Sequence, residues 1–319
     1  MTFSVGLFGL GRIGAQYDFS QHTCMTHLRA ITTSKSLKLE FAYDPNIDVE
    51  LGKKLAGDQF IFDEETLRKK LKDIDLAVIA APTEIRRTLI EIITGSSNIQ
   101  RILCEKPLAL DLSETKNILE LCKNKKIDLK LNFQRRHLPS FKSVNEVLGD
   151  FDLESKASII VTYSGGFSQN AIHFIDLVLF WSKFQKPILK SVIGDPAGDD
   201  CTVNFEIGNC DILIRPNTVK KVTEFNIVVA TDSCKIEIAN AGRNFSYYTV
   251  AEDPDFQNTS YFSHEATRQT EYLSFMKYVY QDVEKWLRCA EIKNDLCDYN
   301  EIVALTKLLE EIQNVYFSN

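Results

Sequence analysis

The fold of the N-terminal half is decided by the stretch Phe3-Ser4-Val5-Gly6-Leu7-Phe8-Gly9-Leu10-Gly11-Arg12-Ile13-Gly14. An apolar run that predicts a β-strand leads directly into glycines spaced Gly-x-Gly-x-x-Gly, after which a helix is expected. The first glycine allows a tight turn, the second lets backbone N–H groups approach a pyrophosphate, and the third lets helix and strand pack closely. The helix N-terminus then faces the phosphate charge. We therefore expect NAD or NADP to bind here. The residues expected at the pyrophosphate are Gly9, Gly11, Arg12, Ile13 and Gly14.

A second apolar strand is predicted over residues 37–43, and it ends at Asp44. An acid at this position can accept hydrogen bonds from both ribose hydroxyls of NAD and repels the additional phosphate of NADP. Asp44 therefore favours NAD over NADP, although Asp44-Pro45-Asn46 is also a good turn sequence. Asp44 lies farther from the glycines than the usual spacing of about 20 residues. We attribute the difference to a loop over residues 17–27, inserted before the helix that carries Leu28 and Ile31.

Composition narrows the functional class. The 319 residues are 44% hydrophobic, which is sufficient for two domains. A net charge of -7 and a pI near 5.4 argue against a nucleic-acid partner. We find neither a membrane-spanning apolar segment nor a basic leader, so we expect no membrane association. The eight cysteines form no CxxC pair and have no histidines at metal-binding spacing. We therefore expect free thiols, no metal and a cytoplasmic location.

After Asp44, helical and strand patterns alternate, which predicts a parallel sheet. The expected strands are 74–81, 101–104 and 128–133. The expected helices are 51–55, 64–71, 84–93 and 113–123, the last with Ser113 as a plausible N-cap. Residues 1–133 are thus predicted to form a Rossmann domain, a doubly wound parallel sheet of the α/β class.

Beyond residue 133 the pattern changes to successive short strands, which predicts an α+β domain over residues 134–319 with a large open, mostly antiparallel sheet. The expected strands are 155–163, 188–194, 201–207, 211–215, 224–230 and 235–238. The expected helices are 170–181, 265–289 and 300–316. Gly208-Asn209 fits a two-residue hairpin turn between two of these strands.

Lys106 is the first candidate for catalysis. It follows the strand at 101–104 within Glu105-Lys106-Pro107, and ligands of parallel sheets bind at the carboxyl ends of the strands. An ammonium there can hydrogen-bond a substrate hydroxyl and stabilise a developing alkoxide. A solvated lysine in a proline turn is the alternative.

His173 is the second candidate. It lies near the start of a helix that follows Gly165-Gly166, and Asp176 falls on the same helix face. Imidazole can take and return a proton near neutral pH. The alternatives are that His173 is a core residue and that Asp176 stabilises the helix N-terminus.

Together these elements resemble the Gfo/Idh/MocA family of oxidoreductases. The resemblance spans nearly the whole chain, and Glu105-Lys106-Pro107 is its most specific element. The other matching elements are Gly9-x-Gly11-x-x-Gly14, Asp44, Ala80-Ala81-Pro82-Thr83, Asn132 with Arg135-Arg136, and His173-x-x-Asp176. The resemblance implies a Rossmann domain joined to an open sheet that commonly forms the dimer interface, so we expect a homodimer or homotetramer. It also implies reversible oxidation of a CHOH group on a sugar, inositol or nucleotide sugar. Among family members, the chain is most similar to those linked to bacterial surface-polysaccharide sugar synthesis.

The resemblance assigns roles to several residues. It makes Lys106 and His173 the expected catalytic pair. Around the cofactor it places Ala81, Pro82, Thr83, Glu105 and Lys106. Around the substrate it places Arg135, Arg136, Gln169, Asn170 and Asp176. The two arginines have a structural alternative, an interdomain salt bridge.

The sequence departs from the family pattern at two positions. Members with a Lys, Asp and His triad carry Asp four residues before the His, where this chain has Gln169, and Gln cannot accept a proton. The family often has a His shortly after the proline matched to Pro82, where this chain has Arg86-Arg87. From the motifs and the resemblance together, we predict an NAD-dependent sugar or nucleotide-sugar dehydrogenase. The alternatives are a glycosidase that uses retained NAD and a non-catalytic NAD-responsive regulator.

Overall fold

The computed structural model describes residues 2–96, 99–149, 156–196, 201–219, 221–289 and 291–318. The chain divides into two compact units. Unit 1 contains Met1–His137 and Leu273–Thr306, and unit 2 contains Leu138–Tyr272 and Lys307–Asn319. Residues 273–306, which follow the second sheet in the sequence, thus belong to the first unit. The division into functional domains at residue 133 stays a prediction.

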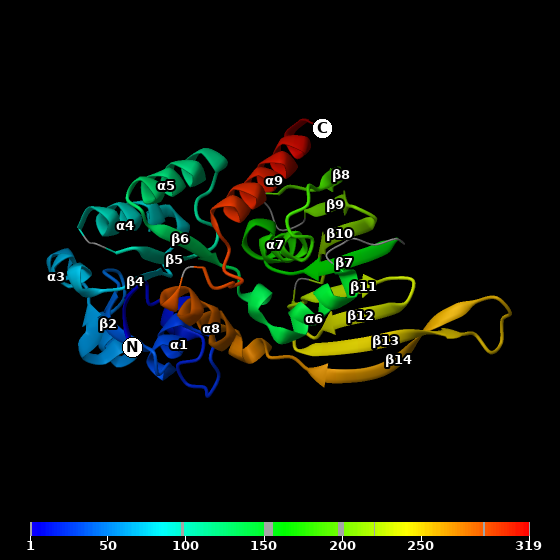
Figure 1. The fold of residues 1–319 in the computed structure, drawn as a ribbon, viewed down its shortest axis with the longest axis horizontal. Coiled ribbons are helices and arrows are strands. Elements are labelled where there is room, and N and C mark those ends of the chain that lie inside the picture. The colour runs from blue at the N-terminus through cyan, green and yellow to red at the C-terminus, as the bar shows by residue number, and fades with distance from the viewer. Residues whose placement is uncertain are drawn as a thin grey trace. The chain divides into compact units, whose positions relative to one another are not determined.

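Unit 1 is built on a six-stranded sheet with the order β3-β2-β1-β4-β5-β6, in which every pairing is parallel (Figure 1). This order confirms the doubly wound Rossmann fold. The strands are β1 Phe3–Phe8, β2 Leu37–Tyr43, β3 Phe60–Ile61, β4 Leu76–Ile79, β5 Arg101–Glu105 and β6 Asp128–Asn132. Strand β4 is fully buried, as expected of a near-continuous apolar run in a parallel sheet. Strand β3 was not predicted from the sequence because it has only two residues.

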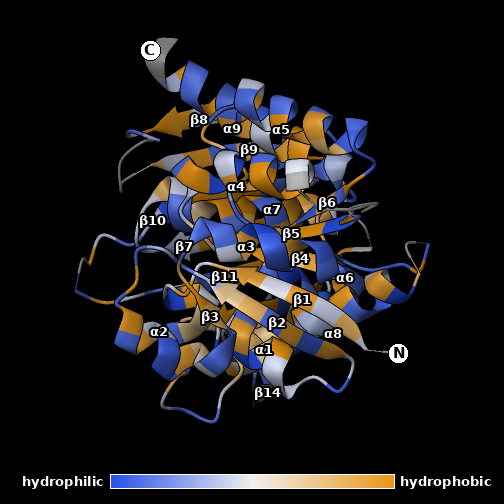
Figure 2. Ribbon diagram, turned by 90° about the vertical axis from the view of Figure 1, so that its left-hand side faces the viewer, coloured by the Kyte–Doolittle hydropathy of each residue, from blue (hydrophilic) through white to orange (hydrophobic). Residues whose placement is uncertain are grey.

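Helices cover both faces of this sheet, with α4 and α5 on one side and α1 and α8 on the other (Figure 1). Figure 2 shows hydrophobic colours concentrated in the central strands and alternating with polar colours along the outer helices. The helices with residues in unit 1 are α1 His27–Thr33, α2 Val49–Ala56, α3 Glu64–Lys70, α4 Thr83–Ser96, α5 Leu112–Asn124, α8 Phe275–Arg288 and α9 Tyr299–Ser318, whose C-terminal part lies in unit 2. Short 3-10 turns occur at Gly57–Gln59, Leu71–Asp73, Gln134–His137 and Tyr272–Ser274.

Aspartate side chains begin three of these helices. Asp48 caps α2 and Asp63 caps α3, each accepting a backbone N–H from the first turn. At α5 the cap is Asp111, which accepts from the Glu114 N–H at 2.7 Å. The expectation of Ser113 as the N-cap is therefore wrong, because the aspartate two residues earlier takes that position.

The second unit contains an eight-stranded sheet with the order β14-β13-β12-β11-β7-β10-β9-β8. Its pairings are antiparallel except for β7 with β10, which confirms the mostly antiparallel prediction. The strands are β7 Ala157–Tyr163, β8 Ile188–Ile193, β9 Thr202–Ile207, β10 Cys210–Pro216, β11 Asn226–Ala230, β12 Cys234–Ala239, β13 Asn244–Glu252 and β14 Ser260–Gln269. The remaining helices of this unit are α6 Pro139–Leu148 and α7 Ile172–Trp181.

The helix expected over residues 265–289 is wrong in its N-terminal part. Residues up to Gln269 belong to β14, which pairs antiparallel with β13, and α8 begins only at Phe275. Because most of β14 is exposed, its sequence lacks the alternation of apolar and polar residues that marks a half-buried strand. Residue 155, at the start of one expected strand, lies outside the described residues.

Candidate functional site

The glycine loop after β1 confirms the steric part of the sequence argument. Gly9 has φ +97, and a Cβ on it would lie 2.8 Å from the Ala80 carbonyl group. A Cβ on Gly14 would come closer than 3.0 Å to the Gly9 carbonyl oxygen. Gly11 differs, since a Cβ there would meet nothing within 4 Å. Packing thus requires the first and third glycines, whereas the second leaves open space.

The helix start expected after the glycines is a π-helical turn, Arg12–Gln16. The chain then forms the predicted loop before α1. Asp18 orders this loop by accepting hydrogen bonds from the backbone N–H groups of Met25 and Thr26 at 2.6 and 3.0 Å. Thr26 in turn caps α1. This insertion explains why β2 and Asp44 lie farther from the glycines in the sequence than is usual.

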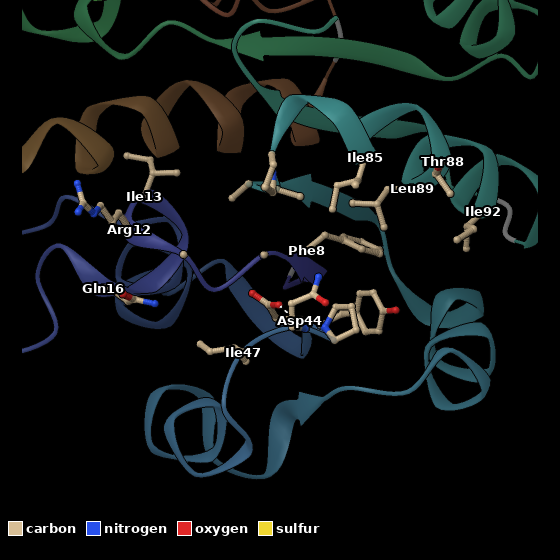
Figure 3. A pocket seen from close by; sticks show the side chains of 18 of the residues that line it. Phe8, Arg12, Ile13, Gln16, Asp44, Ile47, Ile85, Thr88, Leu89 and Ile92 are labelled. Atoms are coloured by element: carbon tan, nitrogen blue, oxygen red, sulfur yellow. Dashed lines mark hydrogen bonds between the residues drawn. The ribbon is translucent and has the colours of Figure 1, made fainter. Parts of the chain in front are cut away.

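A pocket of about 760 Å³ lies against the glycine loop. In Figure 3, Arg12, Ile13 and Gln16 border one side, while Ile85, Thr88, Leu89 and Ile92 of α4 line the other. The pocket brings together most of the residues expected to bind the cofactor, namely Gly9, Gly11, Arg12, Ile13, Asp44, Ala81 and Pro82. Thr83 begins α4 beside this set, and Gly14 supports the loop from within the core.

Asp44 forms the turn expected from the sequence and also lines the pocket, whereas its contact with a ribose stays a prediction. Its Oδ1 accepts the Asn46 backbone N–H at 3.0 Å, which forms the turn. Its Oδ2 accepts the Leu10 N–H at 2.9 Å, which ties β2 to the glycine loop, and the side chain lines the pocket. Glu64 lines the same end. Burial raises the pKa of Tyr43, and the nearby Glu64 and Asp44 charges raise it further, so this end of the pocket is negatively charged.

Glu105, at the carboxyl end of β5, is the centre of a buried polar network. Its Oε1 accepts from Asn132 Nδ2 at 2.7 Å and contacts His27 Nε2 at 3.0 Å. His27 Nδ1 lies 3.0 Å from the Tyr280 hydroxyl. Burial alone raises the pKa of Glu105, but the hydrogen bond and charge of His27, with further help from Lys106 and Asn132, bring it below the ordinary value. Glu105 is therefore an anion held inside the unit.

Lys106 is half-buried directly beside that anion. Burial lowers the pKa of its ammonium from 10.5 to about 8. Glu105 opposes this shift, whereas the positive charges of Arg135 and Arg86 add to it. An amine that titrates near 8 is suited to hydrogen-bonding or proton transfer close to neutral pH.

The two arginines after β6 lie in different environments. Arg136 is fully buried, with Nη1 2.7 Å from Glu301 Oε2 and the guanidinium over the Phe133 ring at 5.6 Å. The ion pair lies within unit 1, which favours a structural interpretation for Arg136. Arg135 is also buried, and its charge acts on Lys106.

The remaining candidates are grouped on unit 2, where α7 follows a turn with positive φ at Gly165 and Gly166. The Asn170 side chain donates to the Gly165 carbonyl at 2.7 Å and so helps hold that turn. Gln169 beside it is exposed. His173 is 7% exposed and Asp176 is 1% exposed, both on α7.

Sequence reasoning missed the partners of the Glu105-Lys106 pair. His27 carries no motif and is 78 residues from Glu105. Arg86 was noted only as a departure from the family pattern. Within the described ranges, no cluster of three or more His, Cys, Asp or Glu residues is arranged to hold a metal ion. Nor does that part of the chain contain a helix with the length and hydropathy needed to cross a membrane.

Residues 3–133 match the family model GFO_IDH_MocA, described as an oxidoreductase family with an NAD-binding Rossmann fold. Inositol 2-dehydrogenase of Rhizobium meliloti is 26% identical over 196 residues, 56% of this chain. The match covers 55% of that relative, so it spans about half of its length.

Solved structures extend the similarity of fold to nearly the whole chain. UDP-N-acetylglucosamine 3-dehydrogenase GnnA from Acidithiobacillus ferrooxidans has a TM-score of 0.69 at 13% identity, covering 99% of this chain and 97% of its own. A super-repressor mutant of Gal80p from Saccharomyces cerevisiae has a TM-score of 0.74 at 14% identity, covering 100% of this chain and 96% of its own. At these identities the likeness concerns the fold alone. The glycine loop and its pocket lie within residues 3–133, the region that matches the model of the Gfo/Idh/MocA oxidoreductase family.

Proposed function

We propose that this protein is an NAD-dependent oxidoreductase that transfers hydride between a CHOH carbon of a sugar or nucleotide sugar and nicotinamide. The observation that carries the proposal is the arrangement at the carboxyl edge of the parallel sheet. A dinucleotide-sized pocket lies against the glycine loop after β1, and Lys106 follows β5 at the same edge of the sheet.

The residues present fit a dinucleotide. Open space at Gly11 admits a pyrophosphate close to the backbone, and the first N–H groups of the Arg12–Gln16 turn face it. Asp44 would hold the ribose next to adenine, while Ala81 and Pro82 would border the nicotinamide half. When bound, the nicotinamide supplies the site that accepts or returns hydride.

The charge of the pocket supports NAD over NADP. Asp44 and Glu64 are the acids that line it, and Arg12 at the glycine loop is the one lining cation among the described residues. A 2′-phosphate beside Asp44 would meet a carboxylate rather than an arginine. Isothermal titration with NAD and NADP tests this directly, and equal affinities would contradict it.

In the proposed mechanism, Lys106 donates a hydrogen bond from its ammonium to the reacting hydroxyl and stabilises the oxygen as negative charge develops. His173 accepts the hydroxyl proton in the oxidative direction and returns it in the reverse direction. Asp176 is proposed to orient His173, because Gln169 cannot accept a proton. Gln169, Asn170 and Arg135 complete the proposed substrate contacts, with Asn170 limited to the groups its turn contact leaves open.

The first experiment is NADH fluorescence of the purified protein with inositol, free hexoses and UDP-, GDP- and CMP-linked sugars. Substrate-dependent NADH formation supports the proposal and identifies the substrate class. Tight NAD binding without turnover on any of these compounds favours an NAD-responsive regulator, the alternative suggested by the fold shared with Gal80p. NAD that survives purification and turns over a glycoside without net NADH favours the retained-NAD glycosidase.

Lys106→Ala and His173→Ala test the assigned roles. Each should lower kcat strongly, and His173→Ala should leave the affinity for NAD close to that of the wild type. Wild-type turnover in either variant would remove that residue from the mechanism.

We also propose that the protein forms a homodimer or homotetramer through the open face of the eight-stranded sheet and resides in the cytoplasm. Apolar side chains are exposed on four of its strands, for example at Ile160, Ile188, Val250 and Phe262. All eight cysteines are free thiols, as a reducing compartment would keep them. Light scattering coupled to size-exclusion chromatography would contradict the assembly by giving a monomer mass.

A further inference from the structure

Arg86 connects two loops at the carboxyl edge of the parallel sheet. It lies in the first turn of α4 and is only 5% exposed. Its Nε donates to the Ala81 carbonyl oxygen at 3.0 Å, and its Nη1 donates to the carbonyl oxygen of Pro107. Ala81 lines the dinucleotide pocket, and Pro107 directly follows Lys106. A single planar side chain thus contacts the loops that leave both β4 and β5.

These two loops leave neighbouring strands. β4 and β5 pair in parallel with Ile79 opposite Cys104, so both chains emerge at the same edge. The other neighbour of Lys106, Glu105, is held by His27 and Asn132. The peptide segment that carries Lys106 is therefore anchored on both sides, by the Glu105 network on one and by Arg86 on the other.

We propose that Arg86 is a positioning residue for Lys106, holding the turn that carries Lys106 against the loop that lines the dinucleotide pocket. The inference rests on the function proposed above, in which Lys106 acts on the substrate hydroxyl. A guanidinium is suited to this task because its rigid, planar fork can donate to two carbonyls at once.

The Arg86 guanidinium also affects the pKa of Lys106. Glu105, Arg135 and Arg86 act on the charge of the Lys106 ammonium. Glu105 stabilises the ammonium, whereas the two arginines destabilise it. Removing the Arg86 charge should therefore raise the pKa of Lys106 above its value of about 8.

Arg87 provides a matched control on the same helix. It is exposed, and it forms an ion pair with Glu91 one turn later at 3.0 Å. Exposed pairs of this kind contribute little to stability. Arg87→Gln therefore changes the net charge of the protein as much as Arg86→Gln does, but it leaves both loops intact.

The experiment compares Arg86→Gln, Arg86→Lys and Arg87→Gln with the wild type. The first readout is the rate at which an anhydride reagent labels the Lys106 amine as a function of pH, followed by peptide mass spectrometry on protein without NAD. The second readout is kcat and KM with the sugar identified by the fluorescence screen. Thermal unfolding shows that each variant is folded.

We expect the labelling midpoint of Lys106 to rise in Arg86→Gln but not in Arg87→Gln. We expect kcat to fall by about 10- to 100-fold in both Arg86 variants, because a small displacement of a catalytic group has effects of this size. KM should change less than kcat. Arg86→Lys keeps the charge and loses the two-carbonyl bridge, so its loss of kcat reports on positioning even if Arg86→Gln does not fold.

A labelling midpoint in folded Arg86→Gln equal to that of Arg87→Gln, or kcat values in the folded Arg86 variants equal to that of Arg87→Gln, would overturn the inference. If the wild type shows no turnover on any sugar, the proposed function fails instead. The labelling midpoints of Arg86→Gln and Arg87→Gln then still decide whether Arg86 controls the surroundings of Lys106.

Discussion

Gly11→Ala should leave the protein folded and weaken its binding to NAD. Gly11 has φ -66, an ordinary value for any residue, and an added Cβ meets nothing within 4 Å. The substitution also reduces the freedom of the unfolded chain, which stabilises proteins by about 0.4–1 kcal/mol at compatible positions. The free energy of unfolding should therefore be unchanged or slightly higher.

The cost should appear only when NAD binds. The open space at Gly11 lies in the pocket where the pyrophosphate is proposed to approach the backbone. A methyl group in a contact of this kind typically costs about 1–3 kcal/mol. That corresponds to a roughly 5- to 150-fold weaker Kd for NAD.

Gly14→Ala is the matched variant, with the opposite expectation. Its Cβ would lie closer than 3.0 Å to the Gly9 carbonyl oxygen, and that atom belongs to the backbone and cannot rotate away. We expect a loss of unfolding free energy of about 1–3 kcal/mol from overpacking alone. Urea unfolding without NAD and calorimetric titration with NAD separate the two effects. A Gly11→Ala protein with the wild-type Kd, or a Gly14→Ala protein with wild-type stability, would refute this division between a ligand-facing and a packing glycine.

Three further predictions concern buried charges. Lys106→Met should raise the free energy of unfolding at pH 7 by about 1 kcal/mol or more, because it removes an ammonium that burial destabilises. The pKa of Lys106 is about 8 in the folded protein and 10.5 ordinarily. Urea unfolding should therefore show the full gain below pH 8 and its loss as the pH approaches 10.5. Glu105→Gln should lower the free energy of unfolding by about 1.5–3 kcal/mol at pH 7 by weakening the contact with His27. Because the folded state holds the pKa of Glu105 below 4.5, this loss should shrink as the pH falls below that value. A difference in unfolding free energy between variant and wild type that stays constant with pH would contradict the assignment. Arg136→Met should destabilise the protein by about 1.5–3 kcal/mol, because it removes the charged hydrogen-bond donor of the partly exposed Glu301. A chemical-denaturation midpoint equal to that of the wild type would argue against a structural ion pair.

The Rossmann half could be predicted because its signals are local. An apolar run of four residues marks the buried strand β4. Gly9 and Gly14 are required by contacts within the loop and with Ala80, which follows that strand. The hairpin turn at Gly208-Asn209 was confirmed for the same reason, as Ile207 pairs with Cys210 across it.

The errors in the second half have an equally local cause. Strands β13 and β14 pair along their length, but β14 buries almost none of its side chains, so selection for a core leaves no alternating pattern in it. Its junction with α8 was consequently assigned to the helix. The shift of the α5 cap, in the first half of the chain, has a different cause: Asp111 and Ser113 both suit a cap, and only the backbone path distinguishes them.

The candidate site likewise contains residues with a local sequence signal and residues without one. Asp44 and Lys106 could be identified from motifs, whereas the groups that control Lys106 come from distant parts of the chain: Arg86 from α4, Arg135 after β6, and the Glu105 partner His27 from α1. No periodicity or spacing in the sequence links these positions. Their relation follows only from the strand order, which gathers the carboxyl ends of β4, β5 and β6 at one edge of the sheet.

This arrangement has a cost in stability that argues for a role of Lys106 in the reaction. A sheet edge built only for packing would not place an ammonium where partial burial and two guanidinium groups lower its pKa to about 8. Glu105 limits the shift, and it is kept ionised by its own buried partners. The opposing charges leave the amine close to the pH at which it can both donate a hydrogen bond and exchange a proton. A neutral residue at the same place should be more stable, and Lys106→Met measures that difference without any assumption about the substrate. A variant no more stable than the wild type would remove this argument for a role of Lys106.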